Sequence, residues 1–428
     1  MSTLNETPSS NRLHIGIYGK TNSGKSSLIN AFTRQDVSIV ADVAGTTTDP
    51  VYKPMEINPL GACVIIDTAG FDDDSELGKS RVEKTHLAAE KTDIAVIVLD
   101  ASCVYQSISK SKEGRSLKFD DVFTDEKKWI DEFKKRNTPV LVVLNKTDLI
   151  GDNTSLCMDW LCETLKPGVS KNAGSLELVM ASAARKLGIE DIKAALTRLM
   201  PEGFGQEFIL GNLVNAGDLV LLVMPQDIQA PKGRLILPQV QTLRELLDRK
   251  CIVMSVTTDK LTDALKVMSK PPRLIITDSQ VFKYVYENKP VESMLTSFSV
   301  LFAAYKGDLP YYVESAKAID KLTPHSKVLI AECCTHAPLA EDIGRVKLPG
   351  MLKKRIGDGL TVDIVSGTDF PQDLTEYDLI IQCGACMFNR KYVLSRIDRA
   401  HIQNIPMTNY GVAIAHITGI LDNVSMPC

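Results

Sequence analysis

Two pairs of candidate metal ligands lie in the C-terminal third of the chain. Cys334-Thr335-His336 is separated by 46 residues from Cys383-Gly384-Ala385-Cys386. This spacing lets two short loops close on one metal centre. Three cysteines suit an iron–sulfur cluster that leaves one iron for a different ligand, whereas three cysteines and a histidine equally suit structural zinc. Ordinary reduced thiols are the simplest alternative.

A second segment with chemical potential lies near the N-terminus. Residues 13–18 predict a buried strand, which runs into Gly19-Lys20-Thr21-Asn22-Ser23-Gly24-Lys25-Ser26-Ser27, and a helix is predicted over 26–32. This is a P-loop in the strand–loop–helix context that the motif requires. Its backbone N–H groups can hold phosphates, Lys25 can reach the β and γ oxygens, and the Ser26 hydroxyl can bind Mg²⁺.

Three further motifs each follow a predicted strand. Asp67-Thr68-Ala69-Gly70 would hold Mg²⁺ through Asp67 and sense the γ-phosphate through the Gly70 N–H. In Asn145-Lys146-Thr147-Asp148, the Asp148 carboxylate can accept two N–H bonds from guanine, which adenine cannot offer. Ser182-Ala183 would complete the base pocket. Together these motifs predict a GTP site rather than an ATP site.

The segment Ala44-Gly45-Thr46-Thr47-Thr48-Asp49-Pro50 resembles the first switch of the TrmE/Era group of GTPases. The resemblance implies that Thr47 binds Mg²⁺ and senses the γ-phosphate, and that Asn22 binds a K⁺ ion that stimulates hydrolysis. A polar loop residue facing water is the alternative for Asn22. Lys25, Thr47 and Gly70 are the residues predicted to serve hydrolysis. The predicted nucleotide site comprises Asn22, Ser23, Gly24, Lys25, Ser26, Ser27, Thr47, Asp67, Asn145, Lys146, Asp148, Ser182 and Ala183.

Two other stretches of this region have no motif. Phe71 stands where Ras-like proteins carry a water-orienting glutamine, which argues against a Ras-like mechanism. We interpret the following Asp72, Asp73 and Asp74 as a solvated loop, with a water-positioning carboxylate as the alternative. Residues 102–128 are expected to form a charged surface loop leading into a helix over 124–136.

The elements that must position the cysteines are predicted to be α/β. Alternating strands and helices between 203 and 279 suggest a small parallel sheet whose exposed edges favour dimerisation. Further on, buried strands are predicted over 327–331, 360–365 and 379–382. Both ligand pairs follow such strands, and ligands bind at the carboxyl ends of strands in open α/β sheets. Cys333 is expected to be a core residue.

Composition restricts the setting of the protein. A chain of 428 residues predicts two to four domains, and its net charge of −4 offers no basic field for nucleic acid or an anionic membrane. The polar N-terminal segment lacks the apolar core of a secretory signal, and no apolar run is long enough to span a bilayer. We therefore expect a cytoplasmic protein.

The combination of a TrmE-like GTPase with Cys334, His336, Cys383 and Cys386 resembles the HydF family of FeFe-hydrogenase maturation GTPases. The resemblance implies a P-loop GTPase domain at 1–203, a dimerisation domain at 204–283 and a 4Fe–4S domain at 284–428. It also implies a homodimeric or larger scaffold that receives a diiron precursor from the radical-SAM maturases HydE and HydG and delivers it to apo FeFe-hydrogenase. Many relatives have a histidine where this chain has Gln382. The fourth iron would then be exchangeable or bound by His336.

Two alternatives stay open at this level. A regulatory or RNA-maturation GTPase could carry a zinc-stabilised C-terminal domain, although no RNA-binding loop of the KH kind is visible. A nucleotide-dependent redox enzyme could use the cluster for electron transfer. Metal content distinguishes the first alternative, and an exchangeable iron distinguishes the second.

Overall fold

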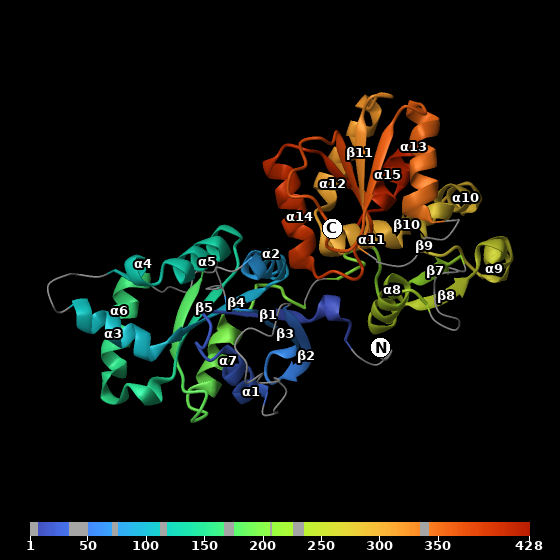
Figure 1. The fold of residues 1–428 in the computed structure, drawn as a ribbon. Helices are drawn as coiled ribbons and strands as arrows, with labels where there is room; N and C mark the ends of the chain where they lie inside the picture. Colours follow the sequence, from blue (N-terminus) through green and yellow to red (C-terminus); the bar gives the residue numbers. More distant parts are fainter. Residues whose placement is uncertain are drawn as a thin grey trace. The chain divides into compact units, whose positions relative to one another are not determined.

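The computed structural model of the protein divides into two compact units, Met1–Gly205 and Gln206–Cys428. Figure 1 shows the ribbon of both units, coloured along the sequence. The described residues are 7–33, 50–70, 76–111, 118–166, 175–205, 208–225, 235–333 and 342–428. The switch segment around Thr47, the segment from Phe71 to Asp74, and the first ligand pair, Cys334 and His336, lie outside the described residues.

The first unit is built on a six-stranded sheet of order β2-β3-β1-β4-β5-β6. All neighbouring strands run parallel except β2, which pairs antiparallel with β3. The central strands are apolar throughout because helices cover both of their faces. The strands are β1 (Leu13–Tyr18), β2 (Val51–Ile57), β3 (Gly61–Asp67), β4 (Ile94–Asp100), β5 (Val140–Asn145) and β6 (Leu176–Met180).

Helices pack on both faces of this sheet and bury two separate cores. Leu28 of α1 and Ile192 of α7 belong to one core, and Ile130 of α5 and Leu161 of α6 belong to the other. The helices are α1 (Lys25–Thr33), α2 (Glu76–Glu90), α3 (Ala101–Ser111), α4 (Phe119–Val122), α5 (Thr124–Lys135), α6 (Thr154–Leu165) and α7 (Ile189–Arg198).

The expected surface loop over 102–128 is wrong for its first part, because α3 begins directly after β4. The segment is rich in serine and lysine, which is typical of a surface loop, although its apolar residues are spaced as in a helix. Ala101, Val104 and Ile108 recur at helical spacing and are all buried. Strand β2, in which four of seven residues are exposed, was also not predicted.

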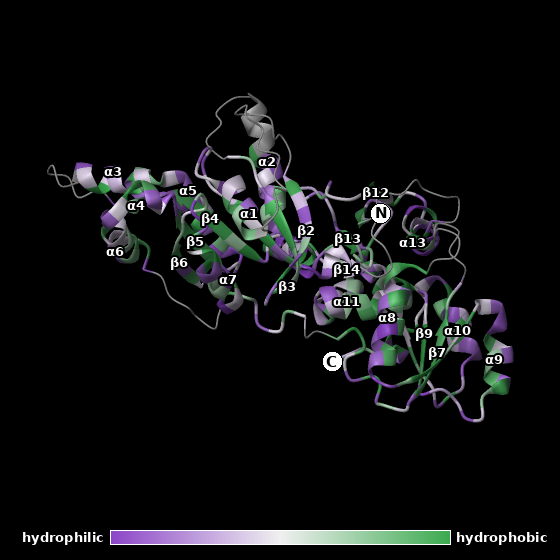
Figure 2. Cartoon of the chain, turned by 90° about the horizontal axis from the view of Figure 1, so that it is seen from below, coloured by the Kyte–Doolittle hydropathy of each residue, from purple (hydrophilic) through white to green (hydrophobic). Residues whose placement is uncertain are grey.

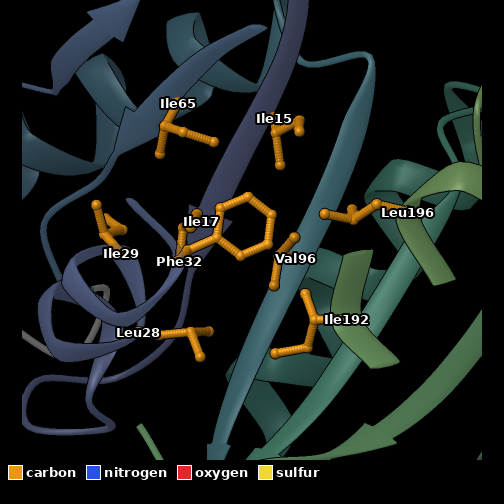
Figure 3. A pocket seen from close by; sticks show the side chains of 9 residues that line it. All are labelled: Ile15, Ile17, Leu28, Ile29, Phe32, Ile65, Val96, Ile192 and Leu196. Atoms are coloured by element: carbon orange, nitrogen blue, oxygen red, sulfur yellow. The ribbon is translucent and has the colours of Figure 1, made fainter. Parts of the chain in front are cut away.

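A small cavity of about 10 Å³ lies inside the first core. Figure 3 shows its entirely apolar lining, with Phe32 of α1 facing strands β1 and β4. This volume is at the lower limit for one water molecule, and the lining offers that water no hydrogen bond. The cavity is therefore a packing defect beneath the P-loop helix rather than a ligand site.

The second unit begins with a four-stranded sheet of order β10-β9-β7-β8, in which all strands are parallel. Its fourth strand, β10, lies beyond residue 279, where the predicted alternation of strands and helices ends, and beyond residue 283, the end of the dimerisation domain that the family resemblance implies. The four residues of Met294–Ser297, MLTS, contain no apolar run longer than two residues, unlike the equally short strand LIIQ at Leu379–Gln382. The elements are β7 (Leu219–Val223), α8 (Leu237–Asp248), β8 (Ile252–Val256), α9 (Leu261–Val267), β9 (Leu274–Thr277), α10 (Phe282–Asn288) and β10 (Met294–Ser297).

A second four-stranded parallel sheet follows, of order β12-β11-β13-β14. Its two central strands are the ones predicted to precede the cysteine pairs, and they are neighbours. The elements are α12 (Leu309–Ala316), β11 (Lys327–Ala331), α13 (Leu348–Ile356), β12 (Thr361–Val365), β13 (Leu379–Gln382), α14 (Arg390–Ile402), β14 (Met407–Asn409) and α15 (Tyr410–Ile417).

Helix α11 (Phe298–Lys306) packs with elements of both sheets of the second unit (Figure 1). Phe302 joins the core of the first sheet, while Val300 and Ala303 join a core that also contains Leu329 of β11. The Ser297 hydroxyl caps this helix by accepting from the Val300 N–H at 3.2 Å. Because the helix is buried on several sides, its polar last residue, Lys306, is also buried.

Figure 2 shows the apolar strands of the two units against helices of mixed hydropathy. None of the helices in the described segments combines the length and apolar character that a bilayer span requires.

Candidate functional site

The P-loop joins β1 to α1 and is already curled around its own lysine. The Lys25 Nζ donates to the carbonyl oxygens of Gly19 at 2.7 Å and Lys20 at 2.8 Å. The Ser23 hydroxyl is buried and accepts or donates no hydrogen bond within the described residues. A buried polar atom without a protein partner in a loop of backbone N–H groups fits a phosphate oxygen.

Glycine is required at position 24 for two reasons. Gly24 has φ +93°, which disfavours any side chain, and a Cβ there would overlap the Asn145 amide nitrogen. The same amide donates to the Ser23 carbonyl oxygen at 3.1 Å. This hydrogen bond between the Asn145 side chain and the Ser23 backbone therefore joins the P-loop to the base motif.

The base motif lies where the ends of β4, β5 and β6 meet. The side-chain oxygen of Asn145, Oδ1, accepts from the Ala183 N–H at 3.1 Å. The Ser182 hydroxyl donates to one oxygen of Asp148, whose side chain remains exposed. These contacts leave the Asp148 carboxylate oriented and accessible, as recognition of a guanine edge requires.

Lys146 connects the base motif to the P-loop through its side chain. Its Nζ donates to the Asn22 carbonyl oxygen at 2.6 Å and forms an ion pair of 2.7 Å with Asp100 at the end of β4. The sequence reasoning did not find Asp100. Its signal was its place directly after a buried strand, the same place that Asp67 and Asn145 occupy.

The Mg²⁺ side of the pocket is partly described. Asp67 ends β3, opposite Ile17 of β1, and burial raises the pKa of its carboxyl group. The next residue, Thr68, donates from its hydroxyl to the Ile17 carbonyl oxygen at 2.7 Å, which holds this edge of β3 against β1. The structure thus brings together the P-loop, Asp67, Asn145 to Asp148, and Ser182 and Ala183. Gly70 follows three residues after Asp67, and Thr47 lies outside the described residues.

A cysteine-containing turn forms the second candidate site, at the carboxyl end of β13. Cys383 directly follows this strand, and the Cys333 N–H, beyond the end of β11, donates to the Cys383 Sγ at 3.2 Å. Hydrogen bonds from Cys333 lower the pKa of the Cys383 thiol, whereas burial raises the pKa of the Cys333 thiol. The two strand ends therefore meet at this thiol, and Cys333 is a buried core residue as expected.

The turn from Cys383 to Phe388 is held by groups from strand β14 and helix α14. Ala385 adopts a left-handed conformation with φ +51°. The Asn409 amide donates to the Cys383 carbonyl oxygen at 3.4 Å. The Phe388 ring faces the buried Arg396 guanidinium at 4.8 Å. Cys383 and Cys386 are both partly exposed residues that pack beside the core.

Lys306 is a second residue that the sequence reasoning did not assign to a site. Its Nζ donates to the carbonyl oxygens of Ala385 at 3.3 Å, Cys386 at 3.0 Å and Phe388 at 2.6 Å. Burial lowers the pKa of Lys306 to about 8. The available signal was a lysine ending an otherwise apolar helix, Phe298–Lys306.

Within the described residues, no three His, Cys, Asp or Glu side chains gather as a metal site. Of the four predicted ligands of the cluster, only Cys383 and Cys386 lie in that part of the chain. The preceding residue, Gln382, is buried, and its side-chain oxygen has no hydrogen-bond partner among the described atoms.

Three family models match the chain in succession. Residues 14–146 match the 50S ribosome-binding GTPase family, residues 209–307 the hydrogen maturase F dimerization domain, and residues 310–427 the hydrogen maturase F tetramerization domain. The three matches follow one another without overlap and place a GTPase before two hydrogen maturase F domains, with residues 147–208 between the first match and the second.

Curated relatives resemble the GTPase part. The GTPase Der of Wolinella succinogenes is 39% identical over 149 residues, which are 34% of this chain and 27% of the relative. The tRNA modification GTPase MnmE of Lachnoclostridium phytofermentans is 31% identical over 209 residues, 48% of this chain and 38% of the relative. The chain thus spans about a third of the length of these relatives. A solved structure of Aquifex aeolicus Era covers 60% of this chain and 98% of its own at 22% identity and a TM-score of 0.35.

We expect Gly24→Ala to weaken GTP binding about tenfold or more, equivalent to about 1.4 kcal/mol. The new Cβ would push the Asn145 amide away from the Ser23 carbonyl and separate the base motif from the P-loop. Titration with a fluorescent GTP analogue measures the change. Gly61→Ala is the matched control, because Gly61 has φ +80° and nothing within 4 Å of its added Cβ. Equal losses in both variants would show that backbone strain alone, not the contact, is responsible.

Proposed function

The chain belongs to the HydF family of hydrogenase maturation GTPases, and we propose that it is a GTP-hydrolysing carrier for metal clusters. In this proposal it holds a resident 4Fe–4S cluster, receives a diiron precursor as cargo, and delivers that cargo to apo FeFe-hydrogenase. The radical-SAM maturases HydE and HydG would supply the cargo. The carrier would act in the cytoplasm, without nucleic acid or membrane as partners, consistent with a net charge of −4.

The observation that carries the cluster proposal is the contact between the Cys333 N–H and the Cys383 sulfur, at 3.2 Å. It brings the chain that leads into Cys334 to the turn that bears Cys383 and Cys386. Sulfur ligands at adjacent strand ends, one of them with a lowered pKa, suit iron. The proposed ligands are Cys334, Cys383 and Cys386, and three thiolates leave the fourth iron exchangeable, with His336 as the alternative ligand.

The nucleotide pocket supports the GTPase part of the proposal. In this proposal Lys25 would bind the phosphates, Ser26, Thr47 and Asp67 would serve Mg²⁺, and Asp148 would bind guanine. The contacts of Lys25 with the P-loop and of Asp148 with Ser182 support these roles. GTP and GDP would hold the switch segments differently and so alter the arrangement or partner affinity of the carrier.

Self-association is supported by the matches to dimerization and tetramerization domains. The first sheet of the second unit ends in the edge strand β8, where Ile252 is 59% exposed. An unpaired edge of this kind is a template for another chain. Support for the RNA-maturation alternative is confined to the GTPase part, since the MnmE match covers 48% of the chain and the later domains match hydrogen maturase F.

Metal and sulfide analysis of anaerobically purified protein tests the proposal. We expect about four irons and four sulfides per chain, and a reduced-cluster signal in electron paramagnetic resonance. One zinc ion per chain and no sulfide would refute the cluster proposal and favour a structural metal domain.

We expect Lys25→Ala and Cys383→Ala to have opposite effects. Lys25→Ala removes the ammonium that reaches the phosphates, so GTP hydrolysis should be lost while iron content is kept. Cys383→Ala removes an anchoring thiolate, so iron should be lost while hydrolysis is kept. The exposed Cys162 of α6 provides the control Cys162→Ala, which should change neither quantity. Normal iron in Cys383→Ala would contradict the ligand assignment.

We further propose that K⁺ stimulates hydrolysis through the Asn22 side chain, which is exposed in the P-loop at φ +62°. Glycine tolerates this conformation, so Asn22→Gly removes the amide without adding strain. We expect this variant to hydrolyse GTP at the same rate in KCl and NaCl. Asn137→Gly, at φ +53° after α5, should keep the K⁺ response of the wild type. A K⁺ response that survives in Asn22→Gly would exclude Asn22 as the ligand.

A further inference from the structure

Among the described residues of the second unit, Lys306 is the most deeply buried lysine. Its side chain is 2% exposed and ends helix α11, between the two sheets. A buried charge is costly unless other groups compensate it. The surroundings of this ammonium group therefore indicate what it is there to bind.

The number of acceptors around the Lys306 Nζ matches the number of donors of an ammonium group. A neutral amine has two N–H donors, whereas an ammonium group has three. The Nζ lies within hydrogen-bond distance of three acceptors, the carbonyl oxygens of Ala385, Cys386 and Phe388. All three acceptors belong to the cysteine turn, so that Lys306 binds the turn as a unit.

No negatively charged partner from the described carboxylates accompanies this ammonium group. Within the described residues, the ion pairs of the second unit do not include Lys306. The acidic groups that act on it electrostatically are the thiols of Cys386, Cys333 and Cys383. In the described part of the second unit, a positive charge thus lies beside the cysteine turn without an ion pair to a carboxylate.

We propose that Lys306 positions the Cys383–Cys386 turn and provides the counter-charge for an anionic iron–sulfur cluster bound there. This inference rests on the proposed function, since it names a residue that acts on the proposed cluster. A cluster with three thiolate ligands is anionic, and one-electron reduction adds a further negative charge. A fixed ammonium group behind the turn stabilises the reduced state more than the oxidised state. Lys306 accordingly raises the reduction potential of the cluster and slows its loss.

Lys306→Met tests this proposal, because methionine keeps most of the side-chain volume and removes the charge. Lys306→Arg keeps the charge. Lys289→Met is the matched control: the Lys289 Nζ also binds backbone carbonyls, those of Pro290 at 3.1 Å and Ser293 at 2.7 Å, in a turn without cysteines. All variants are made in the full chain and reconstituted anaerobically with iron and sulfide.

Reduction potential, followed by electron paramagnetic resonance during titration with dithionite, is the first measurement. We expect a more negative potential and faster loss of iron to a chelator in Lys306→Met, wild-type values in Lys289→Met, and a potential restored toward the wild type in Lys306→Arg. A wild-type potential in Lys306→Met would overturn the proposal. Loss of the cluster in both Lys306 variants would assign the residue a purely structural role and would also overturn it.

Alkylation of metal-free protein by iodoacetamide is the second measurement, and it does not depend on the cluster. Peptide mass spectrometry gives the rate at each thiol. We expect changed rates at Cys383 and Cys386 in Lys306→Met and unchanged rates at the exposed Cys162. Absence of iron and sulfide in the wild type would refute the proposed function by itself. Unchanged alkylation at Cys383 and Cys386 would refute the positioning role of Lys306 separately.

Discussion

Parallel strand pairing is the constraint on which both candidate sites depend. Strands that run in the same direction must end at the same edge of their sheet, so the loops that follow them are neighbours. In the first unit this places the P-loop after β1, Asp67 at the end of β3 and Asn145 at the end of β5 around one pocket. In the second unit the pairing of β11 with β13 brings Cys333 to Cys383.

Side chains from neighbouring loops then join each edge into a single structure. Asn145 binds both the P-loop and the loop at Ala183, and Lys146 binds both the P-loop and Asp100. The P-loop, which is expected to bind the phosphates, is therefore connected to the base motif by direct hydrogen bonds. Leaving a buried polar group of this kind unpaired costs about 1–3 kcal/mol. These hydrogen bonds therefore favour one arrangement of the P-loop and the base motif over others.

The cysteine turn is also held by a side chain from a distant element, in this case the charged side chain of Lys306. Three backbone carbonyls of the turn accept from one buried ammonium group, that of Lys306. A water-filled site would supply such acceptors at little cost, whereas a buried site must build them from the chain. Helix α11 can do this because it is covered by both sheets of the second unit and ends at the turn.

Sequence reasoning identified what short contiguous patterns encode and missed what they do not. The P-loop, the guanine motif and the strands before the cysteines were predictable, since each combines a buried run of residues with a loop of characteristic composition. Helix α3 was missed because polar residues dominate its composition. Strands β10 and β14 were missed because their short sequences, MLTS and MTN, contain no apolar run longer than two residues.

The sequence by itself determined the GTPase motifs, the α/β class of the fold and the family, because these depend on local patterns in a fixed order along the chain. The partners of those motifs were decided only by tertiary structure. Strand order brings Asp100 into an ion pair with Lys146, and helix packing brings Lys306 to the cysteine turn 79 residues away. Periodicity reports which face of an element is buried, but it does not report which distant residue lies against that face.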